Sequence, residues 1–361
     1  MNDSWMHALV LHHIGDLRYE RVPRPSLAQG EALIRVVAVG VCGSDIPRIF
    51  EHGTYRFPLI PGHEIAGIIE EVAGPGPRQV GERVAIKPLI PCKHCPYCEI
   101  GAFGQCLSYD YLGSRSDGGF AEFVKAPQEN LVPLPEQVDL VEAALTEPAA
   151  VALHAIRQAE VQPGDTVAIL GTGPIGMMIA QWARIHGAGQ ILLVDIDPQK
   201  LQHAQKLGLG FVCNAREEDP VQWIKQRTSD QGAPIVIEAA GTSITFEQAL
   251  RAARPLGRVV IVGNPSSDVH LPQKTVSQIL RKQLCIKGAW NSHFARLPVD
   301  EWRVVVEMLA AGKLNLRDLI SHRIPLAEAP SFLRAMYAKK GFFLRVVLLN
   351  TERSSDESSS L

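Results

Sequence analysis

The chain lacks several features that would restrict it to a membrane or to a nucleic acid. Although 46% of its 361 residues are hydrophobic, no run approaches the roughly 18 to 20 uncharged apolar residues of a membrane span. Residues 1–10 lack the basic stretch and apolar core of a secretory signal. Charge of one sign is not in excess, since the formal net charge is -2. The chain therefore lacks the excess of basic residues with which proteins bind the phosphate backbone of a nucleic acid. We therefore expect a cytoplasmic protein, without a membrane or nucleic-acid partner, that acts on a small molecule.

Cysteine is not abundant, but four of the seven cysteines are clustered. In a reducing cytosol disulfides are rare and clustered thiols more often bind metal. The cluster consists of Cys92, Cys95, Cys98 and Cys106, in a lobe of about residues 90–110. Four sulfurs close around zinc in a tetrahedron and leave no open position for substrate, so this pattern predicts a structural zinc site. The alternative, an iron–sulfur cluster, is disfavoured because the run lacks the Cys-Pro ending of bacterial ferredoxins.

The length of the chain favours two domains. From Glu31 to about Val141, short β-like runs such as residues 33–39 and 65–72 alternate with glycine and proline, which predicts a strand-rich, twisted or barrel-like unit. After Glu147 the pattern changes. Strands are expected at residues 166–170, 191–194, 235–237 and 259–262, and helices at residues 174–186 and 198–207. This alternation is typical of βαβ units with a parallel sheet.

The C-terminal part of the chain is harder to assign from periodicity. We expect a helix at about residues 299–311, an apolar segment at residues 320–326, a further helix and a closing strand at residues 344–349. These elements could extend either domain. Residues 350–361 are rich in serine and charge, which predicts disorder.

A glycine motif directly follows the strand at residues 166–170 and opens a helix. The first glycine permits a tight turn, the second lets the backbone approach a pyrophosphate, and the third lets helix pack on strand. Asp195 ends the next strand, about where a carboxylate binds the adenosine ribose and repels a 2′-phosphate. We therefore predict NAD as the cofactor. The candidate cofactor-binding residues are Gly171, Gly173, Pro174, Ile175, Gly176 and Asp195.

Two other segments are dense in possible metal ligands. One is Gly40-Val-Cys42-Gly-Ser44-Asp45, and the other is Pro61-Gly62-His63-Glu64, with Glu147 just before the change of pattern. Sulfur, imidazole and carboxylate are the donors of a catalytic zinc, which keeps one position open. Each residue alone is ambiguous, because a single cysteine is more often a small core residue and a lone histidine is more often satisfied by a hydrogen bond.

Together with the segment Asp117-Gly-Gly-Phe-Ala-Glu122, these motifs resemble those of the zinc-containing medium-chain alcohol dehydrogenase family, over about residues 8–348. Residues 42–50, 109–115 and 280–282 are most similar to its sugar-alcohol branch, and there to enzymes of sugar-alcohol phosphates. The resemblance implies an α/β architecture. It consists of a GroES-like, β-rich catalytic domain from residues 1–155 and 293–361, and a Rossmann doubly wound parallel-sheet domain from residues 156–292.

The resemblance also implies a chemistry and assigns site residues. Cys42, His63 and Glu147 would hold the catalytic zinc, with Glu64 either coordinating directly or exchanging with a water, so that each chain would carry two Zn²⁺ ions. Ser44 would be the first group of a proton relay, and Asp45 would bond the second nitrogen of His63. Pro47 stands where several relatives carry a histidine, so the outer end of the relay is open to solvent or Glu64.

The substrate is the least constrained part of the prediction. Arg48 and Arg115 are candidates for binding a substrate phosphate, since arginine grips phosphate with paired bonds, but solvated surface charges are an equal alternative. Free sorbitol or xylitol dehydrogenase and L-threonine 3-dehydrogenase are rival activities, and a catalytically silent NAD-binding structural protein is the alternative of a different class. The family resemblance suggests a homodimer or homotetramer.

Overall fold

The computed structural model describes residues 4–265 and 267–350, and the chain forms two compact units. The first unit comprises Met1–Glu147, Phe294–Ala310 and Ile320–Leu361, and the second comprises Pro148–His293 and Ala311–Leu319. The expected boundary between residues 155 and 156 lies inside helix α4 (Thr146–Ala159), and residues 311–319 group with the second unit rather than with the expected C-terminal segment. Among the described residues, no helix has both the length and the apolar character needed to span a bilayer.

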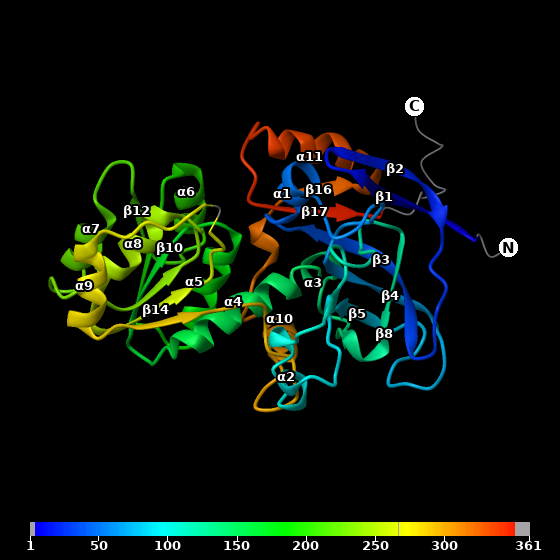
Figure 1. Ribbon diagram of the computed structural model, residues 1–361, viewed down its shortest axis with the longest axis horizontal. Helices are drawn as coiled ribbons and strands as arrows, with labels where there is room; N and C mark the ends of the chain where they lie inside the picture. The colour runs from blue at the N-terminus through cyan, green and yellow to red at the C-terminus, as the bar shows by residue number, and fades with distance from the viewer. Residues whose placement is uncertain (1–3, 266, 351–361) are drawn as a thin grey trace. The chain divides into compact units, whose positions relative to one another are not determined.

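A seven-stranded sheet forms the centre of the first unit (Figure 1). Its strands are β3 (Glu31–Val41), β4 (Glu64–Val72), β5 (Arg83–Ile86), β8 (Phe123–Pro127), β9 (Leu131–Pro133), β16 (Ile320–Pro325) and β17 (Arg345–Leu349). Strand β3 pairs antiparallel with β4, β8 and β17. Its buried residues, such as Ile34 and Val36, pack well on a pleated surface because they are β-branched. The β-rich prediction for this region is confirmed.

Short elements complete the first unit. Two-stranded sheets are made by β1 (Trp5–His13) with β2 (Asp16–Pro23) and by β6 (Leu89–Ile90) with β7 (Asp110–Tyr111). The α-helices are α1 (Asp45–Pro47), α2 (Pro96–Glu99), α3 (Leu140–Ala143), α10 (Glu301–Ala310) and α11 (Ala329–Tyr337). Single turns of other helical types are η1 (Arg48–His52), η2 (Phe103–Gln105), η3 (Gln128–Asn130) and η5 (Leu326–Glu328).

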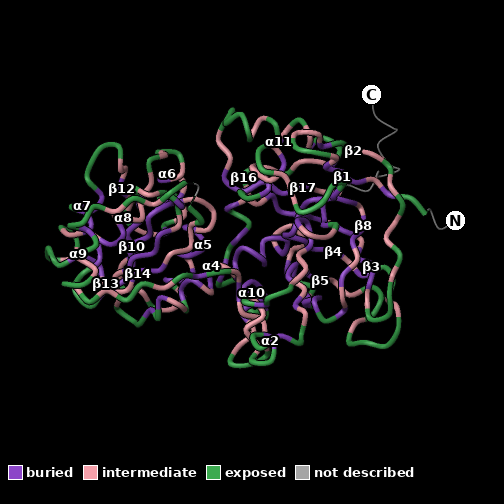
Figure 2. The backbone as a smooth tube through the Cα atoms, in the orientation of Figure 1, coloured by how far each residue is buried: buried purple, intermediate pink, exposed green. Residues whose placement is uncertain are grey.

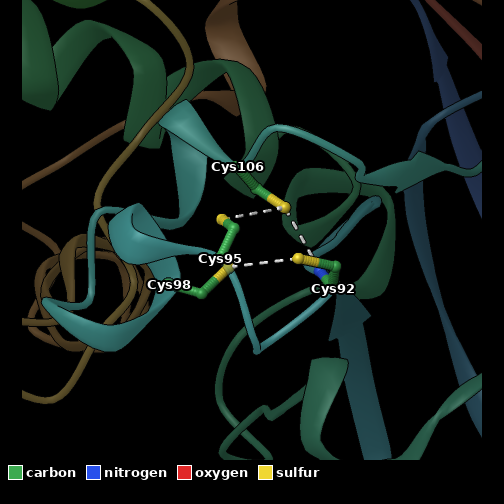
Figure 3. A group of neighbouring side chains, drawn as sticks. All are labelled: Cys92, Cys95, Cys98 and Cys106. Carbon is green, nitrogen blue, oxygen red and sulfur yellow. Dashed lines mark hydrogen bonds between the residues drawn. The ribbon is translucent and has the colours of Figure 1, made fainter.

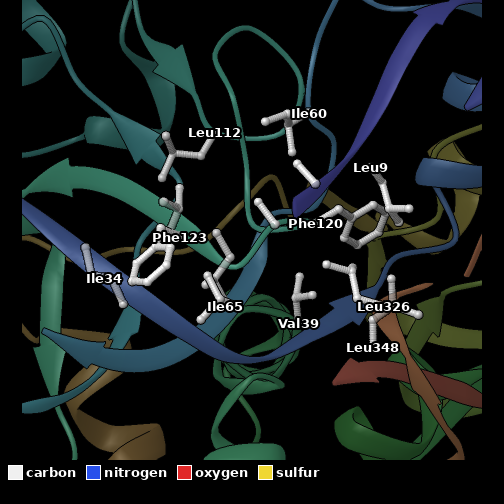
Figure 4. Packing of buried hydrophobic residues seen from close by; sticks show 14 of the residues in the cluster. Leu9, Ile34, Val39, Ile60, Ile65, Leu112, Phe120, Phe123, Leu326 and Leu348 are labelled. Atoms are coloured by element: carbon white, nitrogen blue, oxygen red, sulfur yellow. The ribbon is translucent and has the colours of Figure 1, made fainter. Parts of the chain in front are cut away.

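The core of the first unit joins segments that are far apart in the sequence. Figure 4 shows Phe120 beside Leu9 from the N-terminal hairpin, with Leu326 and Leu348 from the C-terminal segment in the same cluster. Burial of large apolar side chains is the main force that holds such a unit together. The contacts of Leu326 and Leu348 therefore place the C-terminal strands in this unit, a question that periodicity left open.

A six-stranded parallel sheet forms the second unit, in the order β12-β11-β10-β13-β14-β15. Its strands are β10 (Thr166–Leu170), β11 (Gln190–Asp195), β12 (Phe211–Asn214), β13 (Ala233–Glu238), β14 (Ala253–Ile261) and β15 (Cys285–Gly288). Its helices are α4, α5 (Pro174–Ile185), α6 (Pro198–Lys206), α7 (Pro220–Gln226), α8 (Ser243–Ala252) and α9 (Gln273–Lys282), with the turn η4 (Arg317–Leu319). The central strands are buried along most of their length (Figure 2), as expected for a parallel sheet covered on both faces. The predicted βαβ alternation is confirmed.

The prediction of disorder from residue 350 onward is wrong for its first residue. The side-chain amide of Asn350 donates hydrogen bonds to the carbonyl oxygens of Val36 and Ala121, at 3.0 and 2.8 Å. Sequence composition could not reveal these partners, because both lie more than 200 positions away in the chain. Residues 351–361, the remainder of that prediction, lie outside the described residues.

Candidate functional site

Three metal-binding side chains meet where β3 ends and β4 begins. Gly40 of β3 is paired with Glu64 of β4, so the antiparallel ladder brings Cys42, just after β3, close to His63, just before β4. One ligand atom from each of Cys42, His63 and Glu64 lies within 4.8 Å of the other two. A thiolate, an imidazole and a carboxylate at this spacing fit the donor set of a catalytic zinc that keeps a position open.

Glycine at position 40 is required by this arrangement. A Cβ atom at Gly40 would lie 2.1 Å from Oε2 of Glu64, far closer than atoms can pack. The Glu64 carboxylate therefore occupies the space that a larger residue on β3 would need.

Glu64 is fully buried and is paired with Arg345, the first residue of β17. Nη2 of Arg345 lies 2.5 Å from Oε1 of Glu64, and Nη1 donates to the carbonyl oxygen of Val41 at 3.3 Å. Burial raises the pKa of Glu64, whereas the positive charges of Arg345 and His63 oppose that rise. The pair balances a carboxylate that would otherwise be very costly to bury.

Sequence reasoning missed Arg345. The signal that could have found it is a single charged residue inside the apolar run of residues 342–349. A cation in the interior of a strand is rare unless it is paired, but the sequence does not say which acid it pairs with.

Asp45 forms a second buried layer beneath the cluster. Its carboxylate accepts hydrogen bonds from the backbone N–H of Cys42 at 2.9 Å and from Nη1 of Arg48 at 2.8 Å. Oδ1 of Asp45 also lies 3.4 Å from Nδ1 of His63. Burial alone would raise the pKa of Asp45, but His63 and Arg48 outweigh it and hold that pKa below its ordinary value. An ionised carboxylate here can orient the imidazole, as outer-shell acids do in zinc sites.

Glu147 lies beside the cluster but is not within the 4.8 Å group of three. It is buried in the first turn of α4, and its Oε1 accepts a hydrogen bond from the hydroxyl of Tyr111 at 3.3 Å. The Tyr111 ring stands edge-on to the His63 ring, with centroids 5.7 Å apart. Burial raises the pKa of Glu147, against the lowering effect of His63. Tyr111, which sequence reasoning did not select, therefore links Glu147 to the histidine.

The remaining residues selected from the sequence around the cluster have different surroundings. The hydroxyl of Ser44 donates to Sγ of Cys42 at 3.3 Å and is exposed. The guanidinium of Arg48 is engaged by Asp45. That of Arg115 lies over the rings of Tyr55 and Tyr109.

The four cysteines of the lobe converge around one point (Figure 3). The Sγ atoms of Cys92 and Cys98 are 3.9 Å apart, and those of Cys95 and Cys106 are 4.0 Å apart. Sulfurs at about 2.3 Å from a tetrahedral zinc would be roughly 3.8 Å from one another, so these spacings fit the ion. All four are free thiols, and three of them are buried.

The glycine turn of the second unit has the geometry expected of a phosphate-binding loop. Gly171 has φ +103°, and a Cβ atom there would lie 2.7 Å from the backbone nitrogen of Ala240. At Gly176 a Cβ would lie 1.9 Å from the Gly171 carbonyl oxygen, whereas Gly173 has open space around it. Helix α5 begins at Pro174, followed by Ile175. Its free N-terminal amides are suited to an anion.

Asp195, at the end of β11, is tied to the same turn. Its Oδ2 accepts from the backbone N–H of Thr172 at 2.7 Å, and its Oδ1 accepts from those of Ile196 and Asp197 at 2.8 and 2.9 Å. Because each carboxylate oxygen has two lone pairs, Asp195 can still accept a hydrogen bond from a further hydroxyl.

Comparisons with known proteins agree with this architecture. Residues 28–136 match the family model for the alcohol dehydrogenase GroES-like domain, and residues 174–311 match that for zinc-binding dehydrogenases. Galactitol 1-phosphate 5-dehydrogenase of Escherichia coli (strain K12) is 36% identical over 82% of this chain and 86% of its own length. Sorbitol dehydrogenase of Bacillus subtilis (strain 168) is 32% identical over 95% of this chain and 97% of its own.

Solved structures show the same fold. The crystal structure of galactitol-1-phosphate dehydrogenase from Escherichia coli superposes with a TM-score of 0.90 at 33% identity, covering 95% of this chain and 100% of the other. A zinc-binding dehydrogenase from Sinorhizobium meliloti 1021, bound to NADP, has a TM-score of 0.88 at 30% identity and covers 96% of this chain and 100% of its own.

A GroES-like unit with two groups of side chains that could hold a metal ion, joined in one chain to a Rossmann unit, is the architecture of a zinc-type dehydrogenase. The chain belongs to the zinc-containing medium-chain alcohol dehydrogenase family, and its relatives include dehydrogenases of sugar alcohols and their phosphates. The predictions of family, fold class and enzyme class are thereby confirmed. A nicotinamide cofactor and a small-molecule substrate follow from that membership.

Proposed function

We propose that the chain transfers a hydride from a secondary alcohol of a sugar alcohol, or of a sugar-alcohol phosphate, to NAD. The observation that carries this proposal is the convergence of Cys42, His63 and Glu64 at the junction of β3 and β4. A second zinc, at the four cysteines, has a structural role because four sulfurs leave no place for substrate.

The proposed active site divides its work among residues of the first unit. Bound zinc supplies a Lewis acid that lowers the pKa of the substrate hydroxyl. Cys42, His63 and Glu147 would hold the ion, and Glu64, whose carboxylate lies with Cys42 and His63, would coordinate it directly or exchange with a water. The Tyr111 hydroxyl bonds the Glu147 carboxylate and orients it.

Proton removal is assigned to Ser44. Its hydroxyl lies beside Cys42 and is exposed, so it can accept the substrate proton and pass it outward. Glu64 is a poor outer end for this relay, because it is fully buried and paired with Arg345, which favours solvent in that role. Turnover of a Ser44→Ala variant across the pH range tests the assignment, and full activity at every pH would reject it.

Cofactor choice rests on Asp195. We propose that it accepts a bond from the 2′-hydroxyl of the adenosine ribose and repels a 2′-phosphate, so that NAD is preferred. Because one structural relative is bound to NADP, the choice must be measured. The wild type should show the higher kcat/KM with NAD, and Asp195→Ser should lose that preference. A wild type that prefers NADP would contradict the proposal.

The experiment that tests the whole function is an NAD-reduction screen of the purified, zinc-replete protein. Free and phosphorylated polyols, including sorbitol and xylitol, are compared with L-threonine, each with and without a chelator. We expect chelator-sensitive oxidation of a polyol or polyol phosphate. Activity confined to threonine would favour the threonine dehydrogenase alternative, and the absence of any turnover would favour a silent NAD-binding protein. That last alternative is disfavoured because every candidate zinc ligand is present.

We also propose an assembly and a cellular compartment for the chain. It is a homodimer or homotetramer in the cytoplasm. Size-exclusion chromatography with light scattering measures the subunit number, and a monomeric active enzyme would contradict the assembly.

A further inference from the structure

Arg115 is bound to the protein by stacking rather than by ion pairing. Its guanidinium carbon lies 4.2 Å from the ring centroid of Tyr55 and 4.5 Å from that of Tyr109. Its Nε is buried and has no hydrogen-bond partner. Among the described residues, no carboxylate lies within ion-pair distance of it. Stacking on aromatic rings fixes the plane of a guanidinium and leaves its N–H edge available.

Two other arginines of the first unit that could serve the same purpose are already engaged. Arg48 donates to Asp45 at 2.8 Å. Arg56 donates to Asp117 at 2.9 Å, and its Nε donates to the backbone carbonyl oxygen of Arg115 at 3.2 Å. Arg115 is therefore the one of these three cations whose charge has no carboxylate partner in the described residues.

The backbone on both sides of the stack is anchored. The N–H of Arg115 donates to the carbonyl oxygen of Tyr111 at 2.9 Å, and the hydroxyl of Thr54 donates to that of Ser114 at 2.5 Å. The second bond connects the loop that carries Tyr55 to the loop that carries Arg115. A guanidinium held in this way loses little further freedom when it binds an anion.

A continuous series of aromatic contacts leads from Arg115 to the zinc ligands, all within the first unit. Tyr109 stands edge-on to Tyr111 with centroids 6.3 Å apart, and Tyr111 stands edge-on to His63 at 5.7 Å. Arg115 is thus connected to His63 through the rings of Tyr109 and Tyr111. These rings connect the proposed place of oxidation to a cation that has no carboxylate partner among the described residues.

We propose that Arg115, clamped by Tyr55 and Tyr109, binds the phosphate monoester at the far end of a sugar-alcohol substrate, and that Arg48 does not. This inference rests on the proposed function, since it takes the zinc site as the place of oxidation. A phosphate dianion is the ligand because a free guanidinium edge makes paired, charge-assisted bonds to it. Arg48 instead positions Asp45 beneath His63.

The test compares two substrates that differ only in the phosphate, galactitol 1-phosphate and galactitol. In the zinc-replete enzyme, Arg115→Gln should lower kcat/KM for the phosphate ester by about 10- to 100-fold, the size of a lost charged hydrogen-bonding pair. This loss should appear mainly as a higher KM for the phosphate ester. The kcat/KM for free galactitol should stay unchanged. Arg18→Gln, which removes a guanidinium paired with Asp16 on β2, is the control for general loss of charge and should leave both substrates unchanged.

A second variant removes only the clamp. Tyr55 is 72% exposed, so Tyr55→Ala should fold normally and should raise KM for the phosphate ester by about 2- to 5-fold, as expected for an exposed cation–π contact. Equal loss on both galactitol substrates in either variant would overturn the inference, because it would indicate a structural role.

Calorimetric binding of galactitol 1-phosphate to the wild type and to Arg115→Gln separates this inference from the proposed function. Binding that depends on Arg115, without turnover, would support the anion site and reject the dehydrogenase proposal. Turnover of both substrates with no dependence on Arg115 would support the dehydrogenase proposal and reject the anion site. A wild type that prefers a sugar acid such as an aldonate over the phosphate ester would overturn the phosphate assignment.

Discussion

The two groups of metal-binding side chains are built in opposite ways. The four-cysteine cluster is contained in residues 92–106, and its side chains approach one another through a short turn of chain. The Cys42–His63–Glu64 cluster combines the ends of two strands with Arg345 from the last strand of the chain. The first cluster needs only its own segment, whereas the second needs the completed sheet.

The difference lies in charge as well as in distance along the chain. Thiols can be neutral until a metal binds, so their burial alone costs little. Asp45 and Glu64 are fully buried carboxylates, and each is paired with an arginine, Arg48 and Arg345 respectively. A buried carboxylate without its partner is strongly destabilising. The Cys42–His63–Glu64 cluster therefore depends on surroundings that the cysteine cluster does not need.

The largest effect is expected from removing the partner of Glu64. Arg345→Met should lower the free energy of unfolding by about 3–5 kcal/mol, because it leaves a buried charge uncompensated, and should abolish activity. Urea unfolding of the zinc-replete protein, followed by circular dichroism, measures the loss. The matched variant Arg345→Lys keeps the charge and should lose less. A Met variant within about 1 kcal/mol of the wild type would show that Glu64 does not need this cation.

The second prediction distinguishes the four-cysteine cluster from the Cys42–His63–Glu64 cluster by the zinc content of one variant in each. Cys95→Ser and Cys42→Ser should each lose one zinc per chain, measured by atomic emission. Cys95→Ser should also lower the melting temperature, by roughly 5 °C or more, because the lobe loses its cross-link. Cys42→Ser should abolish turnover and change the melting temperature less. Unchanged zinc content in either variant would reject that site.

The same contrast explains what could be predicted from the sequence. The cysteine spacing and the glycine turn are local patterns, and the structure brings their residues together as expected. Strands β10 and β11 were also predictable, because continuous apolar runs bounded by glycine are typical of parallel sheets. Arg345 and Tyr111 were not, since their importance comes from partners that are far away in the sequence. The prediction of disorder at Asn350 was wrong for the same reason, because composition takes no account of the distant carbonyl groups to which its amide donates.

A smaller effect is expected from the outer layer of the catalytic cluster. Asp45→Asn should weaken zinc binding by about 10- to 100-fold, as loss of an outer-shell carboxylate usually does, measured by competition with a chromogenic chelator. Arg48→Gln keeps the contact of Asp45 with His63 and should have a weaker effect. An Asp45→Asn variant with wild-type affinity would show that Asp45 serves only to pair with Arg48.

The smallest effect concerns Glu238, a buried carboxylate in the second unit that is satisfied locally. It accepts bonds from the backbone N–H groups of Ala240 and Gly241, both at 2.9 Å, and from the hydroxyl of Thr245 at 2.8 Å. The first two bonds hold the turn that packs on Gly171. Burial raises the pKa of Glu238 above its ordinary value of 4.5, although these bonds oppose the rise.

The sign of the resulting pH dependence follows from proton binding. Between pH 4.5 and the raised pKa, the folded chain retains a proton that the unfolded chain has released. The contribution of Glu238 to stability therefore falls as pH rises through that window, by less than about 1.4 kcal/mol per pH unit. Glu238→Gln cannot titrate, so the free energy of unfolding of the wild type minus that of the variant should decrease between pH 4.5 and 7. A difference that instead grows with pH would mean that the local donors outweigh burial and stabilise the charged form of Glu238.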